Sequence, residues 1–245
     1  MLEAFAGNLA FTYGTLALRA GRRWLRSDRF SLADGGVPFA FVMNMVVPLG
    51  PLPARDITEA AEAFYGGRGY QVWSLWPVDG ASDAGLETLA SNPVMVRPAG
   101  AHRPEPTDLE VREARDGAGI AMFERTVKAA FGFSEVVQQL PPGAVFAPGA
   151  AGDPDLRLWV GLAGGEPVAT ACSAVSDGYI GVYAVGTVPS ARRRGYGEVM
   201  TAAALGARVD LPATLQASAM GLPVYQRMDF TEVATVERWR RPASV

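Results

Sequence analysis

The sequence of 245 residues offers very little chemistry for metal or disulfide sites. Its single cysteine, Cys172, excludes an intramolecular disulfide and a cysteine-based zinc site. Its single histidine, His102, excludes a centre with several histidine ligands. We therefore expect no bound metal. Lysine is also scarce, since Lys128 is the one lysine among 22 basic residues, and we interpret this as coding bias.

The chain also lacks a positive charge excess and a long apolar run. Its formal net charge of −3 argues against a general nucleic-acid binder and favours cationic small molecules only slightly. Residues 5–20 are fairly apolar, but Asn8, Thr12 and Gly14 interrupt them, and no positive charge precedes them as in a signal peptide. We expect an amphipathic first helix in a cytoplasmic protein with no membrane and no nucleic-acid partner.

What the sequence does contain is ample material for a folded core. Hydrophobic residues make up 49% and charged residues 19%, which is ordinary for a globular protein. The segment 98–107 holds three prolines and marks a seam. We predict an N-terminal α/β domain over 1–100, a proline-rich linker over 101–107 and a second domain over 108–245.

Periodicity and turn residues predict the elements of both halves. In the first half we expect helices over 3–19, 57–66 and 82–90, and strands over 37–47, 70–76 and 93–97. In the second half we expect strands over 108–114, 156–162, 167–175, 179–187, 213–217 and 230–240. The helices expected there cover 116–131, 196–209 and 221–228, and 140–155 is expected to be a long loop. The fold class is α+β.

The most informative segment is Arg192-Arg193-Arg194-Gly195-Tyr196-Gly197-Glu198, between an expected strand and an expected helix. The first N–H groups of a helix lack intrahelical partners and favour an anion. Glycine at 195 and 197 lets a phosphate approach the backbone. A dinucleotide loop would need a third glycine at Met200, and a P-loop would need Gly-Lys-Ser/Thr, which is absent. The alternative is a solvated arginine run before a helix.

Arg192-x-x-Gly195-x-Gly197 resembles the acyl-CoA pyrophosphate signature of the GNAT superfamily of N-acetyltransferases. The segment 215–230 resembles the second signature of that family, in which a strand leads to a helix bearing tyrosine. Asp229 stands where the family usually has glycine. The resemblance covers 108–240 and implies a mixed central sheet flanked by helices. The first half could be a degenerate copy, which would give two similar halves.

The resemblance implies transfer of an acetyl group from acetyl-CoA to a primary amine of a small molecule or peptide, by direct attack in a ternary complex. It implies that the strand 179–187 splays from the strand 213–217 and that pantetheine docks along the free backbone groups of the strand 179–187, like a short extra strand. The pyrophosphate would lie on the amides of 193–198. The cofactor-binding residues implied in this way are Gly186, Thr187, Val188, Arg192, Arg193, Arg194, Gly195, Tyr196, Gly197, Glu198 and Ser218.

The resemblance also implies a catalytic residue, Tyr225, as general acid. A phenol with an ordinary pKa of about 10 stays protonated at neutral pH and can protonate a thiolate, whose thiol has a pKa of about 8.5. The alternative is that Tyr225 packs as a core aromatic. Ser218 could contact the cofactor or cap a helix. The general base is not identified, although Asp177 or Glu135 could act through water.

Two other functions remain open at this point. The chain could be a non-catalytic acyl-CoA-binding regulatory module, or an interaction protein with a coincidental motif. Trp73 and Cys172 are expected to be core residues. The acceptor amine is not readable from the sequence, and the chain could form a homodimer.

Overall fold

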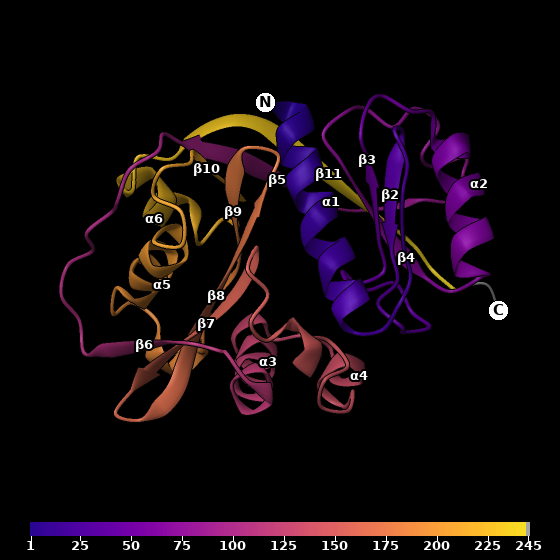
Figure 1. Ribbon diagram of the computed structural model, residues 1–245. Helices are drawn as coiled ribbons and strands as arrows, with labels where there is room; N and C mark the ends of the chain where they lie inside the picture. The colour runs from indigo at the N-terminus through magenta and orange to yellow at the C-terminus, as the bar shows by residue number, and fades with distance from the viewer. Residues whose placement is uncertain (244–245) are drawn as a thin grey trace.

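The computed structural model describes residues 1–243, which form one mixed sheet with helices on both faces (Figure 1). The described residues contain 11 strands in the order β1-β2-β3-β4-β11-β5-β10-β9-β8-β7-β6. The strands are β1 (Trp24–Arg26), β2 (Phe30–Ala33), β3 (Met45–Pro48), β4 (Tyr70–Ser74), β5 (Glu87–Arg97), β6 (Leu109–Glu113), β7 (Leu156–Ala163), β8 (Glu166–Ser176), β9 (Tyr179–Thr187), β10 (Ala213–Gln216) and β11 (Thr231–Arg241). The helices are α1 (Leu2–Arg19), α2 (Ala54–Tyr65), α3 (Gly117–Phe131), α4 (Glu135–Gln138), α5 (Tyr196–Leu205) and α6 (Leu222–Arg227), with short 3-10 turns at Pro148–Ala150 and Pro189–Ala191.

The last strand joins the two halves of the sheet. β11 pairs antiparallel with β4 on one side and with β5 on the other, and β5 pairs in turn with β10. In Figure 1 the yellow strand β11 runs from the α6 side of the molecule across to β4. The segment 98–107 then leads from β5 to the outer edge strand β6. The predicted seam therefore lies within one continuous sheet, and the division into two domains stays a prediction.

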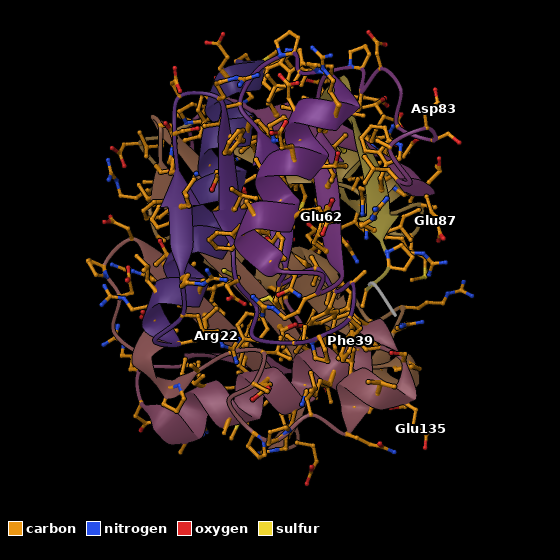
Figure 2. All side chains as sticks on the ribbon, turned by 90° about the vertical axis from the view of Figure 1, so that its right-hand side faces the viewer. Arg22, Phe39, Glu62, Asp83, Glu87 and Glu135 are labelled. Carbon is orange, nitrogen blue, oxygen red and sulfur yellow. The ribbon has the colours of Figure 1, made fainter. Side chains whose placement is uncertain are left out.

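Three apolar clusters fill the space between the sheet and its helices. The first lies under α1 and α3 and contains side chains from both halves, among them Leu9, Trp73, Phe123 and Leu158. The second lies under α5 and α6, and the third lies under α2. Figure 2 shows α2 on the outer side of the first half, with Glu62 on it. The shared first cluster makes the two halves one packed body.

A buried asparagine fastens α1 to the β8–β9 hairpin. The side-chain nitrogen of Asn8 lies 3.1 Å from the carbonyl oxygen of Ala174, 3.3 Å from that of Ser176 and 3.4 Å from that of Tyr179. The Tyr183 hydroxyl donates to Asn8 Oδ1 at 2.7 Å. These bonds satisfy every polar atom of the Asn8 side chain inside the core. Within residues 1–243, no helix combines the length and the apolar character needed to cross a bilayer.

Several expectations for the first half are wrong. The expected strand over 37–47 is a strand only from Met45, because the buried Asn44 side chain donates to the Val37 and Gly69 carbonyls at 2.8 Å and holds the preceding residues in a loop. The expected helix over 82–90 is instead a turn followed by β5, which pairs with β11. The strands β1 and β2 were not expected, and the first half is not confirmed as a copy of the second.

Asn8→Ala tests the junction between α1 and the hairpin. We expect it to lower the free energy of unfolding by about 2–3 kcal/mol, because the Tyr183 hydroxyl and buried carbonyls lose their partner. Leu18→Ala on the same helix is the control, since Leu18 is 53% exposed and should change stability by less than about 0.5 kcal/mol. Urea unfolding measures both values, and equal effects would contradict the role given to Asn8.

Candidate active site

The centre of the site is a split between two parallel strands. β9 and β10 pair only from Ile180–Val182 to Ala213–Leu215. Beyond these pairs β9 continues to Thr187, whereas β10 ends at Gln216 and the next N–H, that of Ala217, donates to Pro93 of β5 at 2.8 Å. The edge of β9 that faces β10 is therefore open from residue 183 onward. This is the splay that the family resemblance implies.

A bulge on β9 lies beside the split. Ala184 has a left-handed backbone with φ of 49°, and the pairing of β9 with β8 shifts register between Thr170 and Cys172. The Thr170 hydroxyl donates to the Ala184 carbonyl at 2.8 Å and holds the bulge. Bulges of this kind bend a strand and occur often beside active sites.

The register of β9 decides which amides face the split. The Val188 N–H donates to the Val168 carbonyl of β8 at 2.9 Å, so this N–H is not free for a ligand, and the assignment of Val188 to the cofactor site stays a prediction. Since donors alternate along a strand, the N–H of Gly186 also points toward β8, and the N–H of Thr187 points toward the open edge. Gly186 has a different role, because a Cβ there would lie 2.7 Å from the Phe131 ring.

The loop before α5 presents a row of unused backbone donors. The N–H groups of residues 193–197 have no acceptor among residues 1–243. Gly195 has φ of 79°, a conformation that favours glycine, and a Cβ at Gly197 would meet nothing within 4 Å. Free donors at a helix N-terminus, next to open space, are the physical requirement for binding a phosphate. The residues present therefore fit a diphosphate group.

The three arginines of this loop differ in their contacts. Arg192 donates from Nε to the Thr187 carbonyl at 3.1 Å and from Nη2 to the Ala130 carbonyl at 3.0 Å. Its side chain thus ties β9 to the C-terminal end of α3, where a cation is favoured. The side chains of Arg193 and Arg194 are exposed and form no ion pair with the described residues. They are the ones free to meet an anionic ligand.

Two other predicted binding residues use their side chains to hold the loop. The buried Tyr196 hydroxyl donates to Asp108 at 2.6 Å. The Glu198 carboxylate lies 2.9 Å from His102 Nε2, and the Glu198 N–H donates to the Gly195 carbonyl at 3.0 Å. That N–H is therefore used within the chain, and the assignment of Glu198 to the cofactor site stays a prediction. His102 thus anchors the segment 101–107 on α5.

Tyr225 lies in the second apolar cluster, under α5 and α6. Its side chain does not line the larger cavity of the molecule. It is 8% exposed, and its ring meets that of Phe230 with centroids 5.9 Å apart. Burial raises the pKa of Tyr225 to about 12, and a hydrogen bond with the Thr201 hydroxyl opposes part of this rise. These surroundings favour core packing, and the role of Tyr225 as acid stays a prediction.

The split opens into a cavity of about 230 Å³ between the two halves. Its walls come from α1, α3, β4, β5, β8, β9, β11, the end of β10 and adjoining loops, and they are mostly apolar and aromatic. Ser218 lies on the wall, and its hydroxyl also accepts the Gly221 N–H at 3.1 Å, so both expected roles remain open to it. Tyr13, Trp73, Asn92 and Arg238 are wall residues that we did not expect.

Among the wall residues, Arg238 is the one with a charged side chain at neutral pH. Neither of the two suggested bases, Asp177 and Glu135, lines the cavity. Asp177 lies 3.8 Å from Arg26, and Glu135 accepts from Gln139 at 3.1 Å. A sequence signal for Arg238 did exist: it lies two residues after the apolar Val236 in a strand, and so on the same face. Residues 1–243 contain no group of three or more side chains that could hold a metal.

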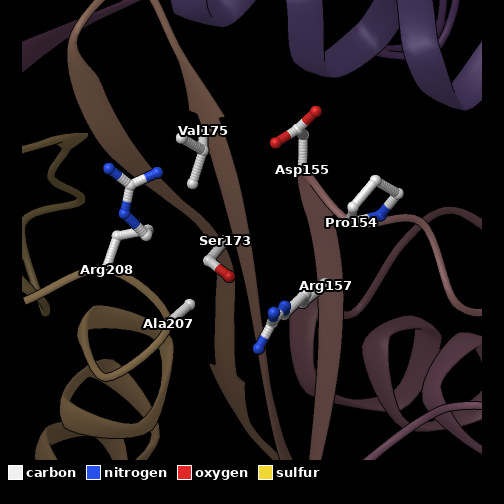
Figure 3. Close-up of a pocket in the computed structure, with 7 residues that line it drawn as sticks. All are labelled: Pro154, Asp155, Arg157, Ser173, Val175, Ala207 and Arg208. Carbon is white, nitrogen blue, oxygen red and sulfur yellow. The ribbon is translucent and has the colours of Figure 1, made fainter.

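A second, smaller cavity lies elsewhere (Figure 3). It measures about 40 Å³, which is room for a few water molecules. Asp155, Arg157 and Arg208 lie around it, and none of its lining residues lines the larger cavity. Its size excludes it as an acceptor site.

No protein-family model and no curated protein sequence matches this chain. Among solved structures, the chain is similar to a GCN5-related N-acetyltransferase from Kribbella flavida, with a TM-score of 0.70, 19% identity, and coverage of 100% of this chain and 96% of that one. A conserved protein of unknown function from Staphylococcus epidermidis gives a TM-score of 0.60 and 13% identity over 90% and 93% of the two chains. A GCN5-related N-acetyltransferase-like protein from Streptococcus suis gives 0.54 and 14% over 87% and 82%. The chain therefore has the GNAT fold.

Arg192→Met tests the structural role of the first arginine. We expect a loss of about 1–2 kcal/mol in the free energy of unfolding, because two hydrogen bonds from a charged, partly exposed donor disappear. Arg194→Met is the matched control and should leave stability within about 0.5 kcal/mol. Chemical denaturation of both variants checks this, and an unchanged Arg192→Met variant would show that the link to α3 contributes nothing.

Proposed function

We propose that this protein is an N-acetyltransferase that moves an acetyl group from acetyl-CoA to a primary amine. One observation carries the proposal: a row of free amides at residues 193–197 adjoins an open strand edge, and that edge leads into a cavity. The GNAT fold of the chain supports the same function by analogy.

Each part of the site has a distinct task under this proposal. The amides of 193–197 hold the diphosphate, and the exposed side chains of Arg193 and Arg194 add positive charge around it. The Thr187 N–H faces pantetheine along the open edge of β9, as an added strand would. Ser218 lies where the split meets the cavity. Bound acetyl-CoA supplies the acetyl thioester.

The transfer forms a bond between the amine nitrogen and the acetyl carbon and breaks the bond from that carbon to sulfur. The amine loses one proton and the departing thiolate gains one. We keep Tyr225 as the donor of that second proton, since its raised pKa keeps it protonated at neutral pH. Among residues 1–243, no carboxylate or histidine lines the cavity, and in this proposal the amine arrives in its neutral form through exchange with bulk water.

A second candidate function is a non-catalytic module that binds acyl-CoA. The buried position of Tyr225 and the absence of acidic side chains on the cavity wall favour it. Such a module would keep the diphosphate loop and show no turnover. The two functions agree on CoA binding and differ in chemistry.

Gly197→Val tests the binding of CoA. We expect the dissociation constant of CoA to rise about tenfold or more, which corresponds to roughly 1.4 kcal/mol, because a side chain would fill the space that the diphosphate needs. The melting temperature should not fall, since a Cβ at Gly197 meets no neighbour. Gly50→Val is the matched control, because a Cβ at Gly50 also meets nothing and Gly50 lies far from the loop in the sequence.

Isothermal titration with CoA gives both affinities. If wild-type protein binds no CoA, or if Gly197→Val binds it as tightly as Gly50→Val, the proposed function loses its basis. Release of free thiol from acetyl-CoA in the presence of an amine then separates the enzyme from the binding module.

Tyr225→Phe tests the proton donor. We expect kcat to fall about 100-fold or more while the affinity for CoA stays the same, because general acid catalysis of this kind contributes about that factor. Steady-state kinetics and titration with CoA give the two quantities. An unchanged kcat with a lower melting temperature would assign Tyr225 to the core and leave another group as the donor.

A further inference from the structure

The far wall of the cavity carries a cation without an anion. The guanidinium of Arg238 lies 4.2 Å above the centre of the Trp73 ring, and its Nη1 donates to Asn92 Oδ1 at 3.2 Å. Its Nε is buried and has no acceptor, and Arg238 forms no ion pair with any carboxylate of residues 1–243. Burial also lowers the pKa of Arg238 from its usual value. A partly buried guanidinium with no anionic partner is unfavourable, and residues 1–243 supply none.

An unused acceptor also lines the cavity. Gln216, the last residue of β10, has its Oε1 buried without a donor. It lies at the point where β10 leaves β9, so this oxygen is close in the chain to Ala217 and Ser218 at the split. Native interiors rarely leave such atoms unpaired, and a pair of opposite kind in one cavity indicates a ligand with both groups.

The Asn92 side chain connects Arg238 with the end of β10. Asn92 accepts from Arg238 through Oδ1 and donates through Nδ2 to the Ala217 carbonyl at 3.1 Å. The cation is therefore fixed one side chain away from the end of β10. A ligand held by Arg238 must place its neighbouring atoms near the split, where acetyl transfer is proposed.

The remaining walls are apolar. Tyr13, Trp73, Phe131, Phe133 and Phe146 contribute aromatic surface, and the volume of about 230 Å³ is below the usual range of roughly 300–1,000 Å³ for ligand pockets. The occupant is therefore small and has an apolar body. A polycation is disfavoured, because the cavity offers Arg238 and no carboxylate.

Resting on the proposed function, we infer that the acceptor is a small apolar amino acid. Arg238 binds its carboxylate, Gln216 Oε1 accepts from its amine, and the aromatic wall holds its side chain. In this reaction the amine nitrogen gains the acetyl group and loses a proton, the departing thiolate is protonated, and the carboxylate is unchanged. This assignment is opposite to the slight preference for cations that the net charge of −3 suggests.

The test compares two amino acids with the amines that lack their carboxylate. Leucine is paired with isoamylamine and phenylalanine with 2-phenylethylamine. Binding to the full chain is measured by isothermal titration without acetyl-CoA, and acetylation is measured by thiol release. Arg238→Met keeps an unbranched side chain on Trp73 and removes the charge. Arg240→Met on the same strand is the control, since Arg240 is exposed and pairs with Glu87 at 2.6 Å.

We expect an amino acid to bind more tightly than its paired amine. Arg238→Met should weaken binding of the amino acid and raise its KM by about tenfold or more, with a smaller change in kcat and no change for the amine. Arg240→Met should behave as wild type.

Three results distinguish a failure of this inference from a failure of the proposed function. If both amines are acetylated as well as the amino acids, and Arg238→Met changes neither, the inference is overturned while the proposed function stands. If neither amino acid binds, the inference is overturned as well. If an amino acid binds in a manner that depends on Arg238 but no thiol is released, the carboxylate site is supported and the proposed function fails.

Discussion

The separation of β9 from β10 after three residue pairs is the constraint on which the rest of the site depends. Parallel strands that stay paired leave no free donors between them, so a ligand could not enter the sheet. Here β10 turns toward β5 through the bond from Ala217 to Pro93, and the bulge at Ala184 bends β9. The open edge, the amide row of α5 and the mouth of the cavity all lie beside this separation.

The site also requires both halves of the chain. β11 lies between β4 and β5, and this position brings Arg238 over Trp73 and beside Asn92. On the other face of the cavity, α1 is held against the β8–β9 hairpin by Asn8. A second half alone would have the amide row, but it would lack β5, toward which β10 turns, and these walls of the cavity. The first half therefore shapes the acceptor end of the site.

Local sequence signals predicted much of the second half. The turns at Gly164-Gly165 and Asp177-Gly178 fix the β7–β8–β9 meander, because glycine adopts the left-handed backbone that these turns need. Gly195 and Gly197 likewise located the amide row. The sequence could not show that the amides of Val188 and Glu198 are used within the chain, since pairing register and helix geometry decide it. The sequence also could not predict the contact between Arg238 and Trp73, because that contact depends on where β11 inserts in the sheet.

Amide-resolved hydrogen exchange, with and without CoA, tests the central claim most directly. The account predicts that CoA slows exchange at residues 193–197 and at Thr187, whose N–H groups lack partners or face the open edge, and leaves Val188 and Glu198 unchanged, since they already donate within the chain. Slowed exchange elsewhere, with the loop before α5 and the open edge of β9 unaffected, would contradict it.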